Sequence, residues 1–409
     1  MRRQILLTAF LLLHGIRPLL HAQEFKLFDR VVQVHGWLSQ GFVYTDENNW
    51  LTMNTSSGSG AMTDMGLNFS TRITDHLRLG AQFYDRNLGQ LGQWHPSLDW
   101  ALADYRLHSW LGIRAGKVKT VLGLFNDTQD QDFLYTFALL PQGVYPTDLR
   151  EATIAHLGAD IYGRIPLKSS ANLAYTVFAG HRHDSIHSGY PYLISQYGAV
   201  FKSLGGLQYG ADLRCQMPAK GPLLGISRLN EDTSGKGTAT DPITTDGTFP
   251  YSEYSRANWT NQFYGEYVIG RLRLDSEYRR YLRDQMIYSG TTENITDVRA
   301  WYVSGGYTLT RNLRLGSYYS HYTLRNEVKG ALAPYFPGKT DTSLPTNHIY
   351  DKVLTLCFDL KKFWNVKLEA HFINGYAFVS YPDGFYPQEN PNGFKPNTNA
   401  LVVRTGFYF

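Results

Sequence analysis

Apolar and polar residues alternate along LNFSTRITDHLRLGAQFYDRNLG, the segment from residue 67 to residue 89. Side chains of an extended strand point to opposite faces in turn, so Leu67 and Phe69 share one face and Arg72 lies on the other. The alternation resumes after the short turn at Asp75-His76. Two strands joined so tightly must form an antiparallel hairpin. The pattern recurs to the C-terminus and restricts the chain to an all-β fold.

Short and long connections take turns along the chain. Tight turns are expected near Asp75-His76, Ser109, Lys168 to Ser170, Leu204 to Gly206, Gly270-Arg271, Arg311-Asn312 and Lys362 to Asn365. Long loops rich in Gly, Pro, Asn, Thr and Asp are expected near 46–60, 90–97, 120–151, 184–193, 218–255, 289–295, 328–346 and 380–397. These connections join sixteen strands. An even number of strands places both chain ends on the short-turn side, as transmembrane barrels do.

Each predicted strand carries its charges on one face only. Leu157 and Ile161, for example, lie opposite Asp160 and Arg164. A soluble β-sandwich or propeller also has many short strands, but it would have to bury charges on nearly every strand, at several kcal/mol for each unpaired one. The charged faces must therefore contact water, and the apolar faces contact lipid.

The composition fits a membrane barrel, because the chain has 29 Tyr, 22 Phe, 8 Trp and 38 Gly. Sixteen strands make a tube too wide for side chains to fill. The predicted fold class is therefore a transmembrane antiparallel β-barrel of about sixteen strands around a water-filled lumen.

The N-terminus has the features of a secretory signal peptide. Arg2 and Arg3 precede the apolar run from Ile5 to Leu13, and Ala22 is a small residue suited to cleavage. We divide the chain into a signal peptide at residues 1–22 and one barrel domain at residues 23–409. Removing the peptide removes three arginines and no acid, which leaves 36 basic and 35 acidic residues from the original 39 and 35. This balance predicts no nucleic-acid partner.

The cysteines and histidines predict no further site. Strand phase places Cys215 outward and Cys357 inward, so we expect two free thiols. The HRHD segment from His181 to Asp184 places two imidazoles on one strand face, which suits zinc or copper. Because no Cys or second carboxylate supports it, we expect a polar rim, no metal and no cofactor.

The final strand, LVVRTGFYF from Leu401 to Phe409, again alternates and ends on an aromatic residue. With the signal peptide, the loop rhythm and the long third loop, it makes the chain resemble the sixteen-stranded outer-membrane porins of Gram-negative bacteria. The resemblance implies an outer-membrane location among lipid and lipopolysaccharide, and a homotrimer. It also implies that the last strand closes against the first, that Arg404 and Tyr408 face the lumen, and that barrel-assembly machinery recognises Phe409.

In similar porins the third loop folds into the lumen and narrows it. Here the acids of that loop would form one wall of the constriction: Asp127, Asp130, Asp132, Asp148 and Glu151. The opposite wall would be a basic ladder, for which strand phase selects Arg72, Arg78, Arg106 and Arg114. For any one of these arginines, a lumen ion pair with a neighbour such as Asp104 or Asp160 is an equal alternative. Asp127 or Thr128 is also expected to cap a short helix with Phe133, Leu134, Phe137 and Leu140 on one face.

Arg280 takes the lipid-facing phase of its strand. At the bilayer midplane it would cost about 2–4 kcal/mol. We expect either that it lies above the apolar band or that a bulge before it shifts the register.

The predicted function is passive diffusion of small hydrophilic solutes and ions through the lumen, with no enzymatic chemistry. A substrate-selective channel for sugars or anions is the alternative, and a lipid-modifying barrel enzyme is a less favoured one. Ser317 and His321 share the outward phase that such an enzyme needs. They are about 13 Å apart along the strand, which is too far for a nucleophile and its base.

Overall fold

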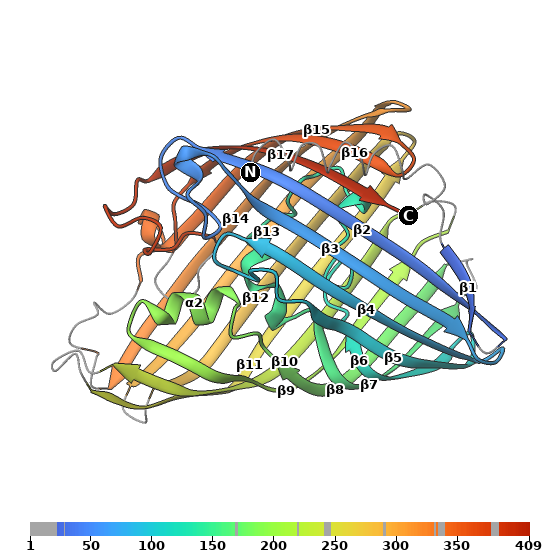
Figure 1. Cartoon of the computed structure of the whole chain (residues 1–409), viewed down its shortest axis with the longest axis horizontal. Helices are drawn as coiled ribbons and strands as arrows, with labels where there is room; N and C mark the ends of the chain where they lie inside the picture. Colours follow the sequence, from blue (N-terminus) through green and yellow to red (C-terminus); the bar gives the residue numbers. More distant parts are fainter. Residues whose placement is uncertain are drawn as a thin grey trace.

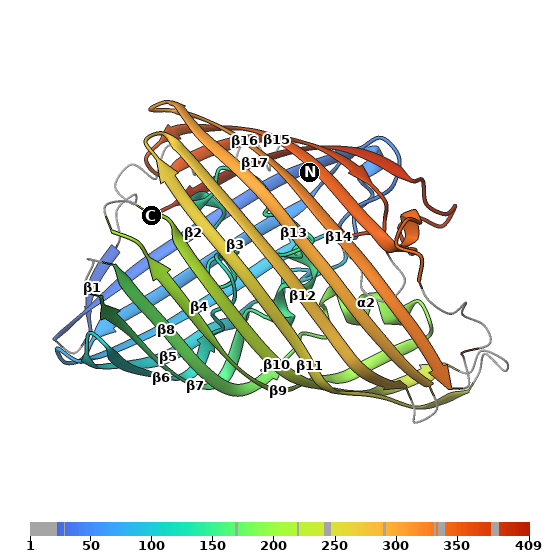
Figure 2. The same cartoon turned by 180° about the vertical axis from the view of Figure 1, so that it is seen from behind.

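A computed structural model describes residues 23–27, 29–167, 171–218, 221–240, 247–288, 292–330, 333, 340–377 and 384–409. Its strands form one antiparallel sheet that closes into a barrel (Figures 1 and 2). The barrel has sixteen strands, which pair in chain order from β2 to β17, and β17 pairs with β2. The additional strand β1 pairs with the first residues of β2. The predicted fold class is confirmed, while the predicted signal peptide at residues 1–22 lies outside the described residues.

The bounds of the elements follow the chain. The strands are β1 (Gln23–Leu27), β2 (Arg30–Thr45), β3 (Ser59–Arg72), β4 (Leu77–Leu88), β5 (Ser97–His108), β6 (Leu111–Lys119), β7 (Ala155–Pro166), β8 (Asn172–His183), β9 (Ala199–Gln216), β10 (Leu223–Thr240), β11 (Thr248–Ile269), β12 (Leu272–Tyr288), β13 (Thr292–Thr310), β14 (Leu313–Gly330), β15 (His348–Lys361), β16 (Trp364–Asn374) and β17 (Asn397–Tyr408). The described helices are α2 (Gly189–Ser195) and the 3-10 turns η1 (Thr55–Ser57), η2 (Asp132–Leu134), η3 (Thr147–Ala152) and η5 (Pro345–Asn347). No helix among the described residues is long and apolar enough to cross a membrane.

The two faces of the strands separate as the alternation predicts. Leu157 and Ile161 on β7 are 57% and 46% exposed, whereas Asp160 between them is 2% exposed. Other exposed outward residues come from all round the barrel: Leu38, Phe42, Leu67, Phe83, Ile113, Val177, Leu213, Phe263, Val303, Leu354, Phe372 and Leu401. The barrel therefore presents apolar side chains outside and charged side chains inside.

The region from residue 199 to residue 269 corrects two predicted connections. β9 runs straight through the predicted turn at 204–206, and β10 and β11 occupy most of the predicted loop at 218–255. The strand needs glycine at positions 205 and 206, because a Cβ at these positions would come within 2.2 Å and 2.0 Å of the carbonyl oxygens of Arg182 and Asp232. The two errors cancel in the strand count.

The missed strand β10 belongs to the tall side of the barrel. Strands β9 to β14 have 17 to 22 residues, and their length is evident in Figure 2. Such strands rise beyond an apolar band about 25 Å tall, so their upper outward residues, such as Lys236, have no reason to be apolar. The alternation that identifies a strand is lost there.

The chain end closes the barrel beside the short turns. β17 pairs with β2, and the backbone of Phe409 exchanges hydrogen bonds with Gly36. Tyr408 donates its backbone N–H to Phe363 in the turn between β15 and β16. The predicted closure of the last strand against the first is confirmed, as are the two free cysteines, Cys215 and Cys357.

Candidate functional site

The third loop, residues 120–154 between β6 and β7, lies inside the barrel (Figure 1). The predicted helix from Asp127 is wrong, because only Asp132–Leu134 form a 3-10 turn there. The apolar side chains do not share one face. Phe137 packs with Tyr318 and Val353, while Leu139 and Leu140 join two other clusters. The loop therefore spreads its side chains over several walls, which an extended backbone allows.

Asp130 fixes the loop to the wall of β4, β5 and β6. Its carboxylate lies 2.9 Å from the ammonium of Lys119 and 3.5 Å from the guanidinium of Arg150, and accepts a hydrogen bond from Gln82 at 2.9 Å. Arg150 also pairs with Asp99 at 2.8 Å. Burial opposes ionisation, but Lys119 and Arg150 hold the pKa of Asp130 below its ordinary value. This acid is therefore a charged anchor.

Asp132 fixes the loop to β16 and β17. Lys367 lies 3.5 Å from its carboxylate and donates to the backbone carbonyls of Asp132 and Phe137, the latter at 2.9 Å. Arg404 lies 3.7 Å from the same carboxylate and donates to the carbonyl of Ala138 at 2.8 Å. Against the effect of burial, the two cations hold the pKa of Asp132 below its ordinary value. The inward placement of Arg404 is confirmed, and so is that of Tyr408, whose ring stacks on Phe133 at 4.4 Å.

Two wall glutamates bind the loop backbone. Glu369 on β16 accepts hydrogen bonds from the N–H groups of Ala138 and Leu139 at 2.8 and 2.9 Å. Glu277 on β12 accepts from the N–H of Leu124 at 3.0 Å and from the hydroxyl of Tyr145 at 2.6 Å. Both side chains are about 1% exposed. The loop thus spans the lumen from β4 to β12 and β16.

The last third of the loop contacts two further partners. Glu151 pairs with Arg86 of β4 at 2.7 Å. Asp148 accepts hydrogen bonds from the hydroxyl of Tyr386 at 2.6 Å and the N–H of Gly384 at 3.1 Å, both in the loop between β16 and β17. Burial raises the pKa of Asp148 to about 6, although these hydrogen bonds oppose the shift.

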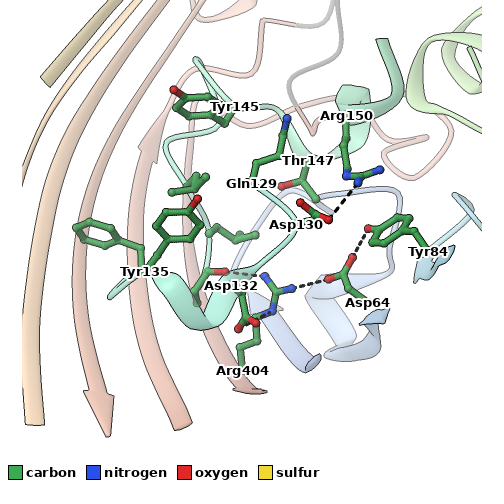
Figure 3. A pocket seen from close by; sticks show the side chains of 14 residues that line it. Asp64, Tyr84, Gln129, Asp130, Asp132, Tyr135, Tyr145, Thr147, Arg150 and Arg404 are labelled. Atoms are coloured by element: carbon green, nitrogen blue, oxygen red, sulfur yellow. Dashed lines mark hydrogen bonds and ion pairs between the residues drawn. The ribbon is translucent and has the colours of Figure 1, made fainter. Parts of the chain in front are cut away.

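A small cavity separates the loop from the wall of β3, β4 and β17 (Figure 3). Its empty volume is about 470 Å³, part of which is open solvent. Charges of both signs line it: Asp64, Asp130, Asp132, Arg150 and Arg404. The guanidinium of Arg150 lies 4.0 Å from the ring centre of Tyr84, whose hydroxyl donates to Asp64 at 2.7 Å. Opposed charges across a narrow space create a transverse field that acts on ions and dipolar solutes.

Comparison with known proteins gives a result for structure only. Neither a protein-family model nor a curated protein matches the sequence. The structure is similar to OmpT, an outer membrane protein of Vibrio cholerae (TM-score 0.55, 14% identity, 95% of this chain and 100% of that one). It is also similar to Salmonella typhi OmpF in complex with daunomycin (TM-score 0.52, 12% identity, 95% and 100%) and to an anion-selective porin from Comamonas acidovorans (TM-score 0.50, 11% identity, 93% and 100%). The fold is that of an outer-membrane porin.

The porin-like barrel holds the predicted arginines away from the loop acids. Arg72 and Arg78 are cross-strand neighbours and exposed at the short-turn end of β3 and β4. Arg106 is exposed above the ring of Tyr162. Arg114 pairs with Asp160 at 2.6 Å, as the lumen-pair alternative predicts.

The structure brings the loop acids to a different set of cations. Their partners among the described residues are Arg86, Lys119, Arg150, Lys367 and Arg404. Asp127 is half-buried, and its backbone carbonyl accepts from Lys119 at 2.9 Å. One signal in the sequence points to part of this set, because Lys367 and Arg404 are inward-phase cations that pair across adjacent strands.

The two histidines of the HRHD segment lie on the outer wall, whereas Arg182 between them is buried. His181 and His183 are exposed, and Arg182 pairs with Asp184 at 2.8 Å. Across the described ranges, no three His, Cys, Asp or Glu residues are placed to hold a metal ion.

Protonation of Asp148 should couple the third loop to pH. The folded protein favours the neutral acid, because the folded pKa of about 6 exceeds the unfolded value near 3.9. The stabilisation is therefore complete below about pH 4 and is lost as the pH rises through about 6. We expect Asp148→Asn to remove up to about 3 kcal/mol of pH dependence from the free energy of unfolding between pH 4 and pH 7.

Denaturant unfolding at a series of pH values measures this effect. Asp127→Asn, at a half-exposed acid of the same loop, is the matched control and should behave as the wild type does. Equal pH dependence in all three proteins would contradict the role of Asp148.

Proposed function

We propose that this protein is an outer-membrane porin that lets small hydrophilic solutes and ions diffuse passively, with the third loop setting the size limit. The observation that carries the proposal is the third loop lying across a charged lumen, bonded to Gln82 of β4, to Glu277 of β12, and to Lys367 and Glu369 of β16. These four side chains are at most 1% exposed. A loop held this way leaves passages much narrower than an unobstructed sixteen-stranded barrel would have.

The polar lumen supports transport of hydrophilic solutes. Ion pairs line its wall at several strands: Arg114–Asp160, Arg214–Asp212, Arg273–Asp275 and Arg314–Asp359. Paired charges hydrate a pore and exclude apolar molecules without binding one ion tightly. This arrangement favours diffusion over capture.

An anion-preferring channel is the second candidate. Arg72, Arg78, Arg106 and Arg164 are exposed near the short-turn mouth, and the described residues include no ion pair to any of them. Cations without acidic partners at a pore mouth raise the local concentration of anions. We therefore expect a modest preference for anions over cations.

The outer wall gives less support to a lipid-modifying enzyme. The ring of His321 stacks between Trp301 at 5.3 Å and Tyr350 at 4.5 Å. Ser317 lies across from Gly305 and Leu354 in the register. These cross-strand neighbours bring no base to Ser317 and no nucleophile to His321. The proposal is therefore a channel without enzymatic activity.

Single-channel recording of the mature chain in a planar bilayer tests the proposal. We expect stable conductance steps that scale with salt concentration, and a reversal potential in a salt gradient with the sign of anion preference. A saturable block of the current by one sugar or anion would instead identify a substrate-selective channel.

A silent barrel would overturn the passive-pore proposal, provided that circular dichroism shows it folded. Hydrolysis of labelled phospholipid by that sample would then favour the enzyme. The lipid assay is run on every sample, so channel conductance and phospholipid hydrolysis are compared in the same preparation.

A further inference from the structure

Three arginines on the outward face of the barrel form a row across neighbouring strands. Arg228 of β10 lies opposite Asn261 of β11, Asn261 opposite Arg280 of β12, and Arg280 opposite Arg299 of β13. We call Arg228, Asn261, Arg280 and Arg299 the arginine row. The side chains of Arg280 and Arg299 are 36% and 38% exposed. The described register has no shift between Leu272 and Arg280, so the bulge considered for Arg280 is not its explanation.

An aromatic row locates the arginines relative to a membrane. Two residues closer to the short turns, β11, β12 and β13 carry the outward residues Phe263, Tyr278 and Trp301, which are also paired in register. The register continues this row through His321 of β14 and Tyr350 of β15. Aromatic girdles of membrane barrels lie at the membrane–water interface. The arginine row therefore lies on the loop side of an aromatic row.

Strand length gives the height of each arginine relative to the apolar band. Arg228, Arg280 and Arg299 are five, eight and eleven residues from the short-turn ends of their strands at Leu223, Leu272 and Thr310. For Arg280 this is about 26 Å along the strand and about 19 Å along the normal of a band about 25 Å tall. The row climbs to the upper edge of the band at Arg299, and long arginine side chains reach upward from lower positions.

The charges of the row are not balanced by the protein. Asp297 binds Arg280 through both carboxylate oxygens at 2.9 and 3.1 Å and binds Arg299 at 2.9 Å. Arg228 instead donates to the amide oxygens of Asn230 and Asn261, both at 2.9 Å. Arg280 and Arg299 thus share one carboxylate, although they lie directly opposite each other, and Arg228 has only amide oxygens as its hydrogen-bond acceptors. Like charges in that position destabilise a sheet.

An anion with several oxygens would relieve this imbalance. Planar guanidinium groups bind phosphate through two parallel hydrogen bonds. Trp259 adds an apolar surface, because its ring lies between Arg228 at 4.7 Å and Arg280 at 5.2 Å. An amphiphile with a phosphorylated head group matches both features.

We propose that the arginine row is a binding site for the phosphorylated head group of an outer-leaflet lipid, the glycolipid of the lipopolysaccharide class. The inference rests on the proposed function only in requiring that the barrel is in an outer membrane. The site fixes one side of the tall wall to the surrounding lipid and supplies the anions that the arginines lack.

Lipid binding by native mass spectrometry tests the site. The probes are lipid A with its phosphates and the same lipid A after dephosphorylation, added to the detergent-solubilised full-length mature barrel. We expect the wild type to retain phosphorylated lipid A, and R228Q/R280Q/R299Q to lose at least about tenfold in affinity, because the charge-assisted hydrogen bonds to phosphate are lost. Dephosphorylated lipid A should bind both proteins equally weakly.

Matched variants separate the site from a general charge effect. R164Q/R271Q/R311Q removes three arginines near the short turns and should bind as the wild type does. R228K/R280K/R299K keeps the charge and should recover part of the binding, which also excludes misfolding as the cause. Equal retention by wild type and R228Q/R280Q/R299Q would overturn the proposal.

Two other occupants are distinguishable. If inorganic phosphate competes as well as lipid A does, the row is a simple anion site and the proposal fails. If R228Q/R280Q/R299Q changes the oligomeric state and leaves lipid retention unchanged, the row contacts a second copy of the chain. Conductance of the same samples reports the proposed function separately, because R228Q/R280Q/R299Q should conduct as the wild type does.

Discussion

Replacing residues 130–148 of the third loop by a short Gly-Ser linker should raise single-channel conductance several-fold. The segment contains Asp130, Asp132, the Ala138–Leu139 backbone and Tyr145, which join the loop to β4, β16 and β12. Without it, the wall groups that now bind the loop would face water. A sixteen-stranded barrel is wide enough to hold an aqueous channel once the loop is gone.

The matched variant keeps the loop at full length and weakens its anchors. D130N/D132N/Y145F retains the bulk of the segment, so its conductance should rise less and fluctuate more than that of the linker variant. Circular dichroism and the cut-off for neutral sugars of increasing size complete the test. Unchanged conductance and cut-off in a folded linker variant would show that the third loop does not limit the pore.

The alternation of residues predicted the barrel because each strand has apolar residues on the face toward lipid and polar residues on the face toward water. Leu157 and Asp160 differ in exposure for a local reason, the pleat of β7, which the sequence displays directly. The loop-side end of β10 was not predicted as a strand, because water contacts both of its faces and its residues therefore do not alternate in polarity. An outward lysine such as Lys236 then carries no sign of the strand.

The site was less accessible to sequence reasoning because its contacts are remote. Asp132 and Lys367 are 235 residues apart, and Ala138 and Glu369 are 231 apart. Strand phase identifies an inward residue but not its height, so Arg72 and Arg114 were as eligible as Arg86 to face the loop. Arg150 adds a second difficulty, because this cation belongs to the third loop itself and pairs with Asp99 of β5 and with Asp130 of the same loop. Only the closed barrel relates these positions.

Lys367→Met should destabilise the barrel by about 3–5 kcal/mol, the cost of breaking a buried ion pair from one side. Lys367 is 0% exposed and donates to the carbonyls of Asp132 and Phe137. Methionine fills a similar volume but leaves both carbonyls and the carboxylate of Asp132 without this donor. Arg404, 3.7 Å from that carboxylate, compensates only in part.

Guanidinium unfolding in lipid vesicles measures the loss, and two variants interpret it. Lys352→Met is the matched control, because Lys352 is exposed on the adjacent strand β15, where its replacement should change stability by less than about 0.5 kcal/mol. K367M/D132L removes both charges and should be more stable than Lys367→Met alone, since the penalty comes chiefly from the uncompensated acid. If Lys367→Met were as stable as Lys352→Met, then water, and not Lys367, would satisfy the carboxylate of Asp132. The third loop would then be held to the wall by Gln82, Glu277 and Glu369 without a contribution from this ion pair.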